Sequence, residues 1–288
     1  MNAKKADKIA TTILYMISAF IVLLLVGLIG YIIYNGRHCL NPHFLFGLPS
    51  IEAGGGIGLH LFNSFYMLII SLLITVPLGV GAGIYLSEYA KEGPLLDGIR
   101  LCIETMASLP SIVVGLFGLL VFVNMTGWGY SIFAGAMAIT ILNLPAMTRV
   151  SENAIITASK KVKQASLGLG ATQWQTIVKV ILPSAIPQIL TGIILAAGRI
   201  FGEAAALLYT AGMSAPGVRL SDGSAFDLFR PAETLSVYIW QLNSEGMVPD
   251  ASKIANGASA VLIIMVLLFN VLARIIGKKI YEKYAGTK

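Results

Sequence analysis

Two oppositely charged residues, Arg199 and Glu203, interrupt a long apolar stretch in the second half of the chain. Residues four apart share one face of an α-helix, so the two side chains are predicted to reach each other. A charged side chain at the centre of a membrane costs about 2.5–3.5 kcal/mol on insertion scales, which disfavours an unpaired position facing lipid. A guanidinium group binds oxyanions through paired hydrogen bonds, and a neighbouring carboxylate can orient it. The pair is therefore a candidate anion pathway; the alternative is a structural ion pair between helices.

The composition predicts the membrane environment in which such a pair would lie. Hydrophobic residues make up 56% of the 288 positions and charged residues 12%, with a mean hydropathy of +0.80. A soluble domain has about 25% charged residues, so we expect an integral membrane protein. Six windows are long and apolar enough to cross a ~30 Å hydrocarbon core as helices of about 20 residues. These windows are 13–34, 64–86, 105–123, 130–147, 186–209 and 255–276.

The first window is predicted to remain as a membrane anchor. Lys4, Lys5 and Lys8 precede it, as basic residues precede the apolar part of a secretory signal peptide. Its apolar run exceeds the roughly 7–15 residues of that part, and no Ala-x-Ala cleavage site follows. The predicted fold is thus all-α, a polytopic membrane protein with six transmembrane helices.

Lysines and arginines gather on one side of the predicted spans. With the N-terminus inside, fifteen of the 20 Lys and Arg residues fall on the cytoplasmic side and four outside, while Arg199 lies within a span. Positive residues favour the cytoplasmic side, so both termini and residues 151–183 are predicted to face the cytoplasm. Cys39 and Cys102 then lie on opposite sides and cannot pair. The net charge of +6 has the same origin, and without a basic soluble domain it does not indicate binding to nucleic acid.

Residues 164–183, QASLGLGATQWQTIVKVILP, mix polar and apolar residues between two predicted spans. Gly170 permits the positive φ that ends one helix, and Thr172 can cap the next. We predict two short helices hinged at Gly170 on the cytoplasmic face of the membrane, where a partner could bind them. The alternative is an amphipathic loop at the membrane surface that has no partner. Apolar residues recur at helical spacing at Trp174, Ile177, Val178 and Ile181.

The same segment resembles the EAA loop of ABC importer permeases, which couples the permease to its ATPase. Gln164 stands at the position of the usual Glu and lacks the charge for a salt bridge to an ATPase arginine, although the shape of the loop is kept. Ser166 and Val180 also depart from the usual Ala and Ile. The residues that match the pattern are Gln164, Ala165, Ser166, Gly170, Val180, Leu182 and Pro183.

Three further runs, at 108–120, 195–212 and 231–240, resemble PstA-type permease subunits of phosphate-specific ABC importers. They read SLPSIVVGLFGLL, LAAGRIFGEAAALLYTAG and PAETLSVYIW, and the resemblance extends over about residues 63–276. It implies the type I permease fold of ABC importers. The implied organisation is a cytoplasmic tail at 1–12, an anchor helix at 13–34, an outer loop at 35–62, a five-helix permease core at 63–277 with a coupling loop at 151–183 and an outer segment at 211–253, and a basic cytoplasmic tail at 278–288.

The resemblance also implies a function and a set of partners. A bacterial-type plasma membrane would hold the chain, which would pass inorganic phosphate into the cytoplasm, with Arg199 and Glu203 on the pathway. The implied partners are an ATP-binding subunit in two copies, a second homologous permease and an extracytoplasmic phosphate-binding protein. Closure of the ATPases is expected to move residues 164–183, and span 186–209 is expected to transmit the movement to the gate.

Other classes of function have less support in the sequence. The chain has no GxxxxGK[ST] phosphate-binding loop, HExxH or GxSxG, so ATP hydrolysis is left to a partner and we expect no enzymatic activity. His38, His43 and His60 are irregularly spaced, and we expect neither a metal nor another cofactor. A permease for molybdate, sulfate or phosphonate is the nearest alternative. A secondary anion transporter should show repeated groups of spans, and none is evident.

Two pairs of glycines have the spacing of helix contacts. Gly79 with Gly83, and Gly198 with Gly202, lie four residues apart within predicted spans. Small residues at this spacing let membrane helices approach closely, so both pairs are predicted to pack against neighbouring helices.

Overall fold

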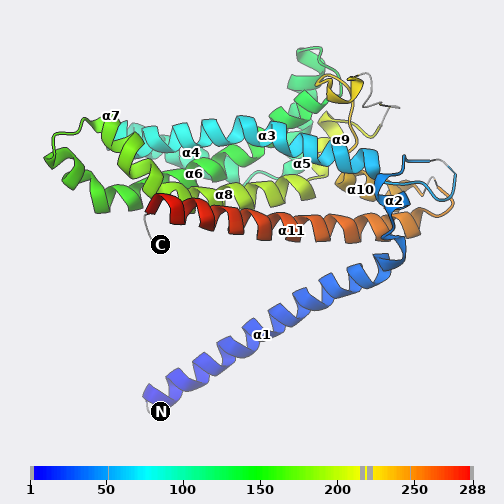
Figure 1. Ribbon diagram of the computed structural model, residues 1–288, viewed down its shortest axis with the longest axis horizontal. Helices are drawn as coiled ribbons and strands as arrows, with labels where there is room; N and C mark the ends of the chain where they lie inside the picture. Colours follow the sequence, from blue (N-terminus) through cyan, green and yellow to red (C-terminus); the bar gives the residue numbers. More distant parts are fainter. Residues whose placement is uncertain (1–2, 51, 215–217, 219–222, 247, 286–288) are drawn as a thin grey trace.

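The computed structural model describes residues 3–50, 52–214, 218, 223–246 and 248–285. Parts of the predicted tails, outer loop and outer segment, among them Arg219 and Lys288, lie outside these described residues. Within them the fold is all-α, as predicted, with long helices lying side by side (Figure 1). The helices are α1 Ala3–Gly36, α2 Pro42–Phe46, α3 Gly58–Ile84, α4 Pro94–Ala107, α5 Ser111–Gly118, α6 Ile132–Gly168, α7 Gln173–Thr176, α8 Leu182–Gly202, α9 Ala205–Thr210, α10 Leu235–Glu245 and α11 Ala251–Ala285.

Among the described residues, five helical stretches are long and apolar enough to cross a membrane. A sixth span exists if α4 and the stretch Ser111–Met125 count as one, and these two helices meet at a bend of 97°. The predicted window 105–123 is therefore not one straight helix. Pro110 precedes α5 with φ −61° and ψ 137°, and a proline has no N–H to continue the helix that ends at Ala107. The five continuous stretches are Ala3–Cys39, Gly58–Tyr89, Ile132–Lys160, Gln173–Gly202 and Ala251–Lys279.

The pairing of α3 with α6 is the most extensive helix contact in the bundle. A Cβ added at Gly79 would lie 2.6 Å from Cγ of Met147, and one at Gly83 would lie 2.6 Å from Cβ of Ser151. Only glycine permits this approach, which confirms that Gly79 and Gly83 are packing residues.

The second glycine pair does not pack in this way. The nearest atom to a Cβ at Gly198 would be in Asn270, 3.8 Å away, and nothing lies within 4 Å of a Cβ at Gly202. The prediction of a second close helix contact is wrong for the described part of the chain, because this stretch of α8 lies partly open.

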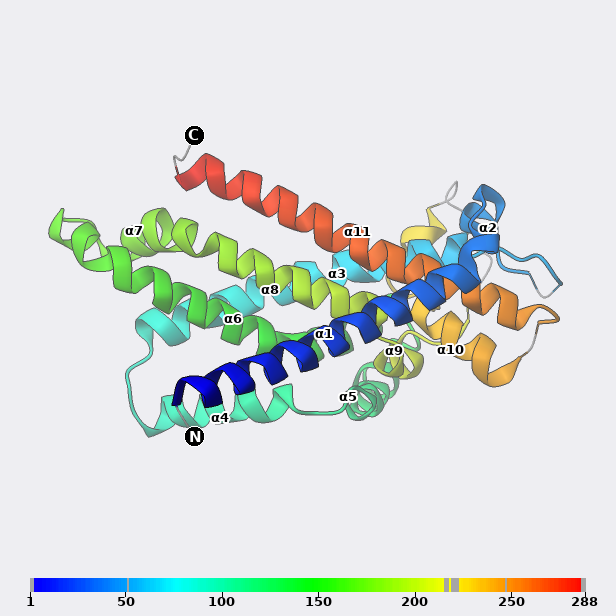
Figure 2. The same ribbon diagram turned by 90° about the horizontal axis from the view of Figure 1, so that it is seen from below.

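The bundle has two distinct ends. Figures 1 and 2 place α7 at one end, which we term the hinge end, and α2 and α10 at the other, which we term the distal end. The N-terminal turns of α1 and the C-terminal turns of α11 lie toward the hinge end in both views. Both termini are thus on the same side as the predicted docking segment.

The first helix is attached to the rest of the chain at the distal end. There a Cβ at Gly36 would lie 2.4 Å from Cβ of Ala260, so α1 and α11 touch closely. Figure 1 shows α1 diverging from α11 toward its N-terminus, and none of its most apolar window is buried. The helix therefore offers its apolar side chains to lipid or to another protein.

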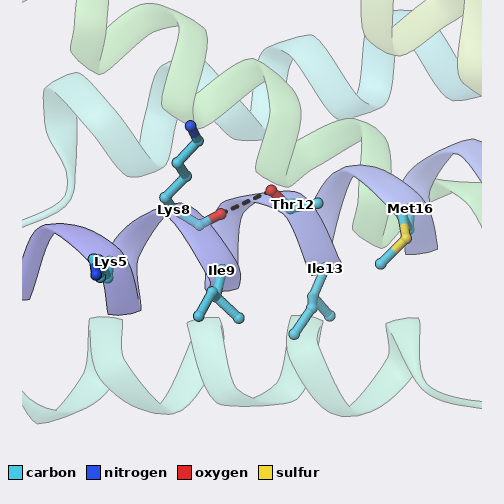
Figure 3. Close-up of a pocket in the computed structure, with 6 residues that line it drawn as sticks. All are labelled: Lys5, Lys8, Ile9, Thr12, Ile13 and Met16. Atoms are coloured by element: carbon cyan, nitrogen blue, oxygen red, sulfur yellow. Dashed lines mark hydrogen bonds between the residues drawn. The ribbon is translucent and has the colours of Figure 1, made fainter. Parts of the chain in front are cut away.

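The N-terminal turns of α1 carry a shallow groove on this open surface. Figure 3 shows Ile9 and Ile13 pointing the same way from the helix, while Lys8 points elsewhere. Thr12 Oγ1 donates a 2.8 Å hydrogen bond to the carbonyl of Lys8. The groove belongs to the unpartnered surface of α1. Its lining residues are Lys5, Lys8, Ile9, Thr12, Ile13 and Met16.

Candidate functional site

The hinge predicted at Gly170 is present. Gly170 has φ +85°, and the turn is closed by hydrogen bonds from its N–H to the carbonyl of Leu167 and from Ala171 N–H to the carbonyl of Ser166. This pattern is a Schellman motif, which ends a helix at a left-handed residue. No atom of the described residues lies within 4 Å of a Cβ at Gly170, so the backbone angle alone calls for glycine here.

The predicted cap at Thr172 is also present, as one half of a capping box. Thr172 Oγ1 accepts from Gln175 N–H at 3.3 Å, and Gln175 Oε1 accepts from Thr172 N–H at 3.0 Å. Two of the backbone groups that a helix start leaves unpaired are thereby satisfied.

The prediction of two short helices needs correction. The first is the end of the 37-residue α6, and α7 continues through the π-helical segment Ile177–Ile181 into α8. Pro183 is the second residue of α8, directly after the π-helical segment. The docking element, as we term residues 164–183, is therefore the corner between two long helices, and a displacement of the corner moves both.

The inner side of the docking element is packed. Ile177 and Ile181 are buried against α6, and Ser166 Oγ lies 2.9 Å from Thr176 Oγ1 across the hinge. This buried hydrogen bond joins the two arms of the corner. Val180, Leu182 and Pro183 are half-buried where the π-helical segment passes into α8.

The outer side of the docking element leaves large apolar side chains in the open. Leu169 is 90% exposed, Trp174 61% and Val178 41%. The four predicted apolar positions thus divide between an inner pair and an outer pair. Gln164 and Ala165 are exposed as well. An exposed apolar cluster of this kind indicates a surface for a protein partner.

The structure separates Arg199 from Glu203. The helix α8 ends at Gly202, and Glu203 follows in an extended conformation with ψ 122°. Arg199 is exposed whereas Glu203 is buried, so the two side chains lie in different surroundings, and the predicted span 186–209 is broken after α8. Among the described residues, no ion pair includes Arg199 or Glu203. The prediction that their side chains reach each other is wrong.

Glu203 instead holds the break in place. Its Oε1 accepts from Ala206 N–H at 3.1 Å, which satisfies a backbone group at the start of α9, and its carbonyl accepts from Ser236 Oγ at 2.6 Å. The residue is 9% exposed. A buried carboxylate with such partners stabilises the local backbone.

Arg199 lies on an exposed polar stripe of α8. The exposed positions recur every three or four residues, as one face of a helix requires, and most of them are polar or small. The hydroxyls of Ser184 and Thr191 donate to carbonyls one turn earlier in the helix, so the amide of Gln188 and the guanidinium of Arg199 are the groups that disfavour contact with hydrocarbon. Gly202, open on the same stripe, adds no side chain beside Arg199. The stripe consists of Ser184, Gln188, Thr191, Leu195, Arg199 and Gly202.

A polar network that the sequence did not reveal closes the distal end. Asn63, fully buried near the start of α3, donates through Nδ2 to the carbonyl of Glu233 at 2.9 Å and accepts at Oδ1 from Arg230 at 2.7 Å. His60 stacks on Tyr238 with ring centroids 3.9 Å apart. Buried polar side chains need partners, so an Asn and a His within an apolar span were the available signal.

The carboxyl of Glu233 lies within this network. Burial, together with the negative charge of Glu245, raises its pKa to about 8. The side chain is therefore mostly protonated at pH 7, and its 3.6 Å approach to Nδ1 of His60 is not a salt bridge between charged groups. Burial also raises the pKa of Tyr238 to about 12. At neutral pH the network therefore holds its residues in place through hydrogen bonds and ring stacking, and Glu233 does not add a full negative charge to it.

In the described part of the chain, no three His, Cys, Asp or Glu side chains gather as metal ligands would. His60 belongs to the distal network, while His38 and His43 are exposed. The residues that stand out by exposure and chemistry are thus those of the α8 stripe and of the docking element.

Comparison with known proteins gives consistent matches. The family model described as binding-protein-dependent transport system inner membrane component matches residues 76–285. The probable ABC transporter permease protein YqgI of Bacillus subtilis (strain 168) is 54% identical, covering 98% of this chain and 99% of the relative. The phosphate transport system permease protein PstA of Pasteurella multocida (strain Pm70) is 31% identical, covering 94% of each chain.

A solved structure gives the same picture for the fold. A chain in the crystal structure of a bacterial alginate ABC transporter, in complex with an alginate pentasaccharide-bound periplasmic protein, matches with a TM-score of 0.64. The match covers 97% of this chain and 96% of the other, at 17% identity. At that identity the likeness shows the fold alone.

Proposed function

This chain belongs to the family of binding-protein-dependent transport system inner membrane components, and we propose that it passes inorganic phosphate inward through an ABC importer. Permeases of this family are transport subunits without a catalytic site, so the chain is a membrane permease and not an enzyme. The substrate rests on the 31% identical relative that is named a phosphate transport permease. The 54% identical relative carries no substrate in its name.

The exposed stripe of α8 is the observation that carries this proposal. A face with Gln188 and Arg199 is unsuited to lipid but suited to water and to a dissolved anion. The guanidinium of Arg199 matches the geometry of a tetrahedral oxyanion, and no acidic side chain of the described residues is paired with it. One wall of the pathway is therefore α8, with Arg199 as its cation.

The docking element is the proposed contact with the ATPase. Its exposed Leu169, Trp174 and Val178 offer an apolar knob at the corner of α6 and α8. Binding of this knob in a groove of an ATP-binding subunit would transmit closure of the ATPase dimer to both helices. Gln164 contributes an amide in place of the usual carboxylate, so contact through charge is replaced by shape and hydrogen bonding.

A second permease subunit completes the pathway. One open helix face cannot enclose an anion, and the stripe of α8 needs an opposite wall. The unburied α1 offers this partner further apolar surface along its length. On the other side, exposed Phe226, Phe229 and Trp240 of the segment 211–253 form an aromatic surface for a phosphate-binding protein. We place the hinge end and both termini in the cytoplasm, as the distribution of Lys and Arg favours.

The test is reconstitution of the purified complex with its ATPase, partner permease and binding protein in liposomes. We expect uptake of labelled phosphate that requires ATP, and Arg199→Ala should reduce uptake about 100-fold with the complex still assembled. Thr191→Ala on the same stripe is the matched control and should cost far less, because it removes no charge. Uptake driven by an ion gradient without ATP would contradict the importer. Preference for molybdate, sulfate or phosphonate over phosphate would contradict the substrate.

A further inference from the structure

Glu88 is a buried acid at the hinge end that neither the stripe nor the docking element includes. It lies in the π-helical segment Tyr85–Tyr89, which prolongs α3, and its side chain is 2% exposed. An acid is almost never buried to this degree without a partner, since the charged form loses its hydration. The burial of Glu88 therefore depends on the residues that it contacts.

Glu88 contacts one residue of the docking element and the residue directly before it. Its Oε2 lies 2.7 Å from Nζ of Lys163, which is on α6 before the hinge. Its backbone carbonyl accepts a 2.9 Å hydrogen bond from Nε2 of Gln173, which begins α7 after the hinge. Gly170 lies between these two partners. One residue of α3 thus holds both arms of the corner.

The other end of α3 is attached to the distal end of the bundle. Asn63 donates to the carbonyl of Glu233, and Ser64 Oγ accepts from the N–H of Leu235 at 2.8 Å. Figure 1 shows α3 running without interruption between the two ends. Gly79 and Gly83 hold its C-terminal turns tightly against α6. A displacement at either end of such a packed helix is passed to the other.

We propose that Glu88 is a positioning residue that links the docking element to α3, so that α3 carries ATPase-driven movement to residues 230–238. The role rests on the proposed function. The movement would then have two paths. One is α8, which leads from the corner to the break at Glu203, and the second is α3. Because α8 begins at this corner and α3 is bound to it through Glu88, the pathway wall and the distal segment would move together.

The test uses the reconstituted complex and measures phosphate taken up per ATP hydrolysed. We expect Glu88→Gln to lower this ratio about tenfold while ATP hydrolysis continues. The reversed pair, Glu88→Lys with Lys163→Glu, should restore most of the ratio, because the attraction between the two sites is regained. Glu104→Gln is the matched control: it breaks the Arg149–Glu104 ion pair, which is exposed and does not touch the docking element. The control should leave the ratio unchanged.

The outcomes separate this inference from the proposed function. A residue that only stabilised the fold would lower the amount of complex without changing the ratio, and that result would overturn the role of Glu88. A normal ratio in Glu88→Gln overturns it too, while the importer itself stands. If Glu88→Gln does not assemble, the reversed pair decides: restored uptake per ATP supports the link, and failure overturns it. A wild-type complex without ATP-dependent uptake overturns the proposed function and this inference together.

Discussion

The hinge end and the distal end of the bundle differ in which side chains they bury and which they expose. At the hinge end, Leu169 and Trp174 stand exposed on a corner whose inner side is packed. At the distal end, Asn63, Arg230 and Glu233 are buried and joined by hydrogen bonds within the chain. The distal end joins polar side chains inside the chain and leaves Phe226, Phe229 and Trp240 exposed, whereas the hinge end exposes its apolar side chains on a corner without such a buried polar network. Exposed apolar groups thus indicate where the chain is unfinished as a single subunit.

The largest expected effect concerns the side of the membrane on which each end lies. Cys102 on α4 is exposed, and we expect an impermeant thiol reagent to label it in inverted vesicles and not in intact cells. Cys39, buried near the carbonyl of Lys253, should be labelled only from outside and only after local opening. The effect is all or none for Cys102. Labelling of Cys102 in intact cells would reverse the proposed topology and remove the hinge end from the ATPase.

The second prediction concerns the geometry of the corner. Gly170→Val should lower co-purification of the ATPase about tenfold, because a β-branched residue at positive φ is strained by about 1 kcal/mol or more and shifts the exposed face. Gly168→Val is a matched control two residues earlier, since Gly168 is helical and equally free of neighbours within 4 Å. Equal ATPase recovery from both variants would show that the angle at Gly170 does not matter.

A third prediction tests whether the distal network is self-contained. The pKa of Glu233, raised to about 8 from 4.5, means that the folded state holds a proton that the unfolded state releases. The free energy of unfolding should therefore fall as the pH rises from about 4.5 to about 8. The loss is on the order of 2 kcal/mol from pH 6 to 8, and the curve levels off above pH 8. Thermal unfolding of the purified protein measures this slope. Glu233→Gln should flatten it, and an unchanged slope in this variant would place the proton elsewhere.

The smallest expected effect lies where the two regions meet, at the break after α8. Glu203→Ala removes the acceptor for Ala206 N–H and should cost about 1 kcal/mol, or about 2–4 °C in melting temperature. Glu203→Gln keeps an acceptor oxygen and should retain most of the stability. Transport lost in Glu203→Gln at normal stability would instead place the carboxylate charge on the pathway, and the assignment of Glu203 as a backbone support would be wrong.

The sequence was sufficient where structure depends on neighbouring residues. The turn at Gly170 and the cap at Thr172 follow from the conformational freedom of glycine and the hydroxyl of threonine, and both were predictable. The break at Glu203 was not, because no residue there forbids a helix. It is held by Ser236, 33 residues away in the sequence. The same holds for Asn63 and Glu233, whose pairing depends on how α3 and α10 come together.

The position of the α8 stripe illustrates a further limit of prediction from the sequence. The spacing of polar residues was present in the sequence, yet a polar face within a span can be buried between helices or left open. Only the packing of α3, α6 and α11 around α8 shows which face stays uncovered. Arg199 was therefore predictable as a residue of interest, while its separation from Glu203 required the tertiary structure.

The divergence of α1 has a consequence for the surrounding lipid. The apolar part of α1, residues 13–34, is about 33 Å long as a helix, close to the ~30 Å of a hydrocarbon core, so a mismatch arises in bilayers that are thinner or thicker than average. Because α1 is attached at the distal end and free along the rest, hydrophobic mismatch is relieved by tilting this helix rather than by deforming the bundle. Bilayer thickness should thus set the angle of α1. Spin-label distances between α1 and α11 in thin and thick bilayers would measure that angle, and a constant distance would show that another protein fixes it.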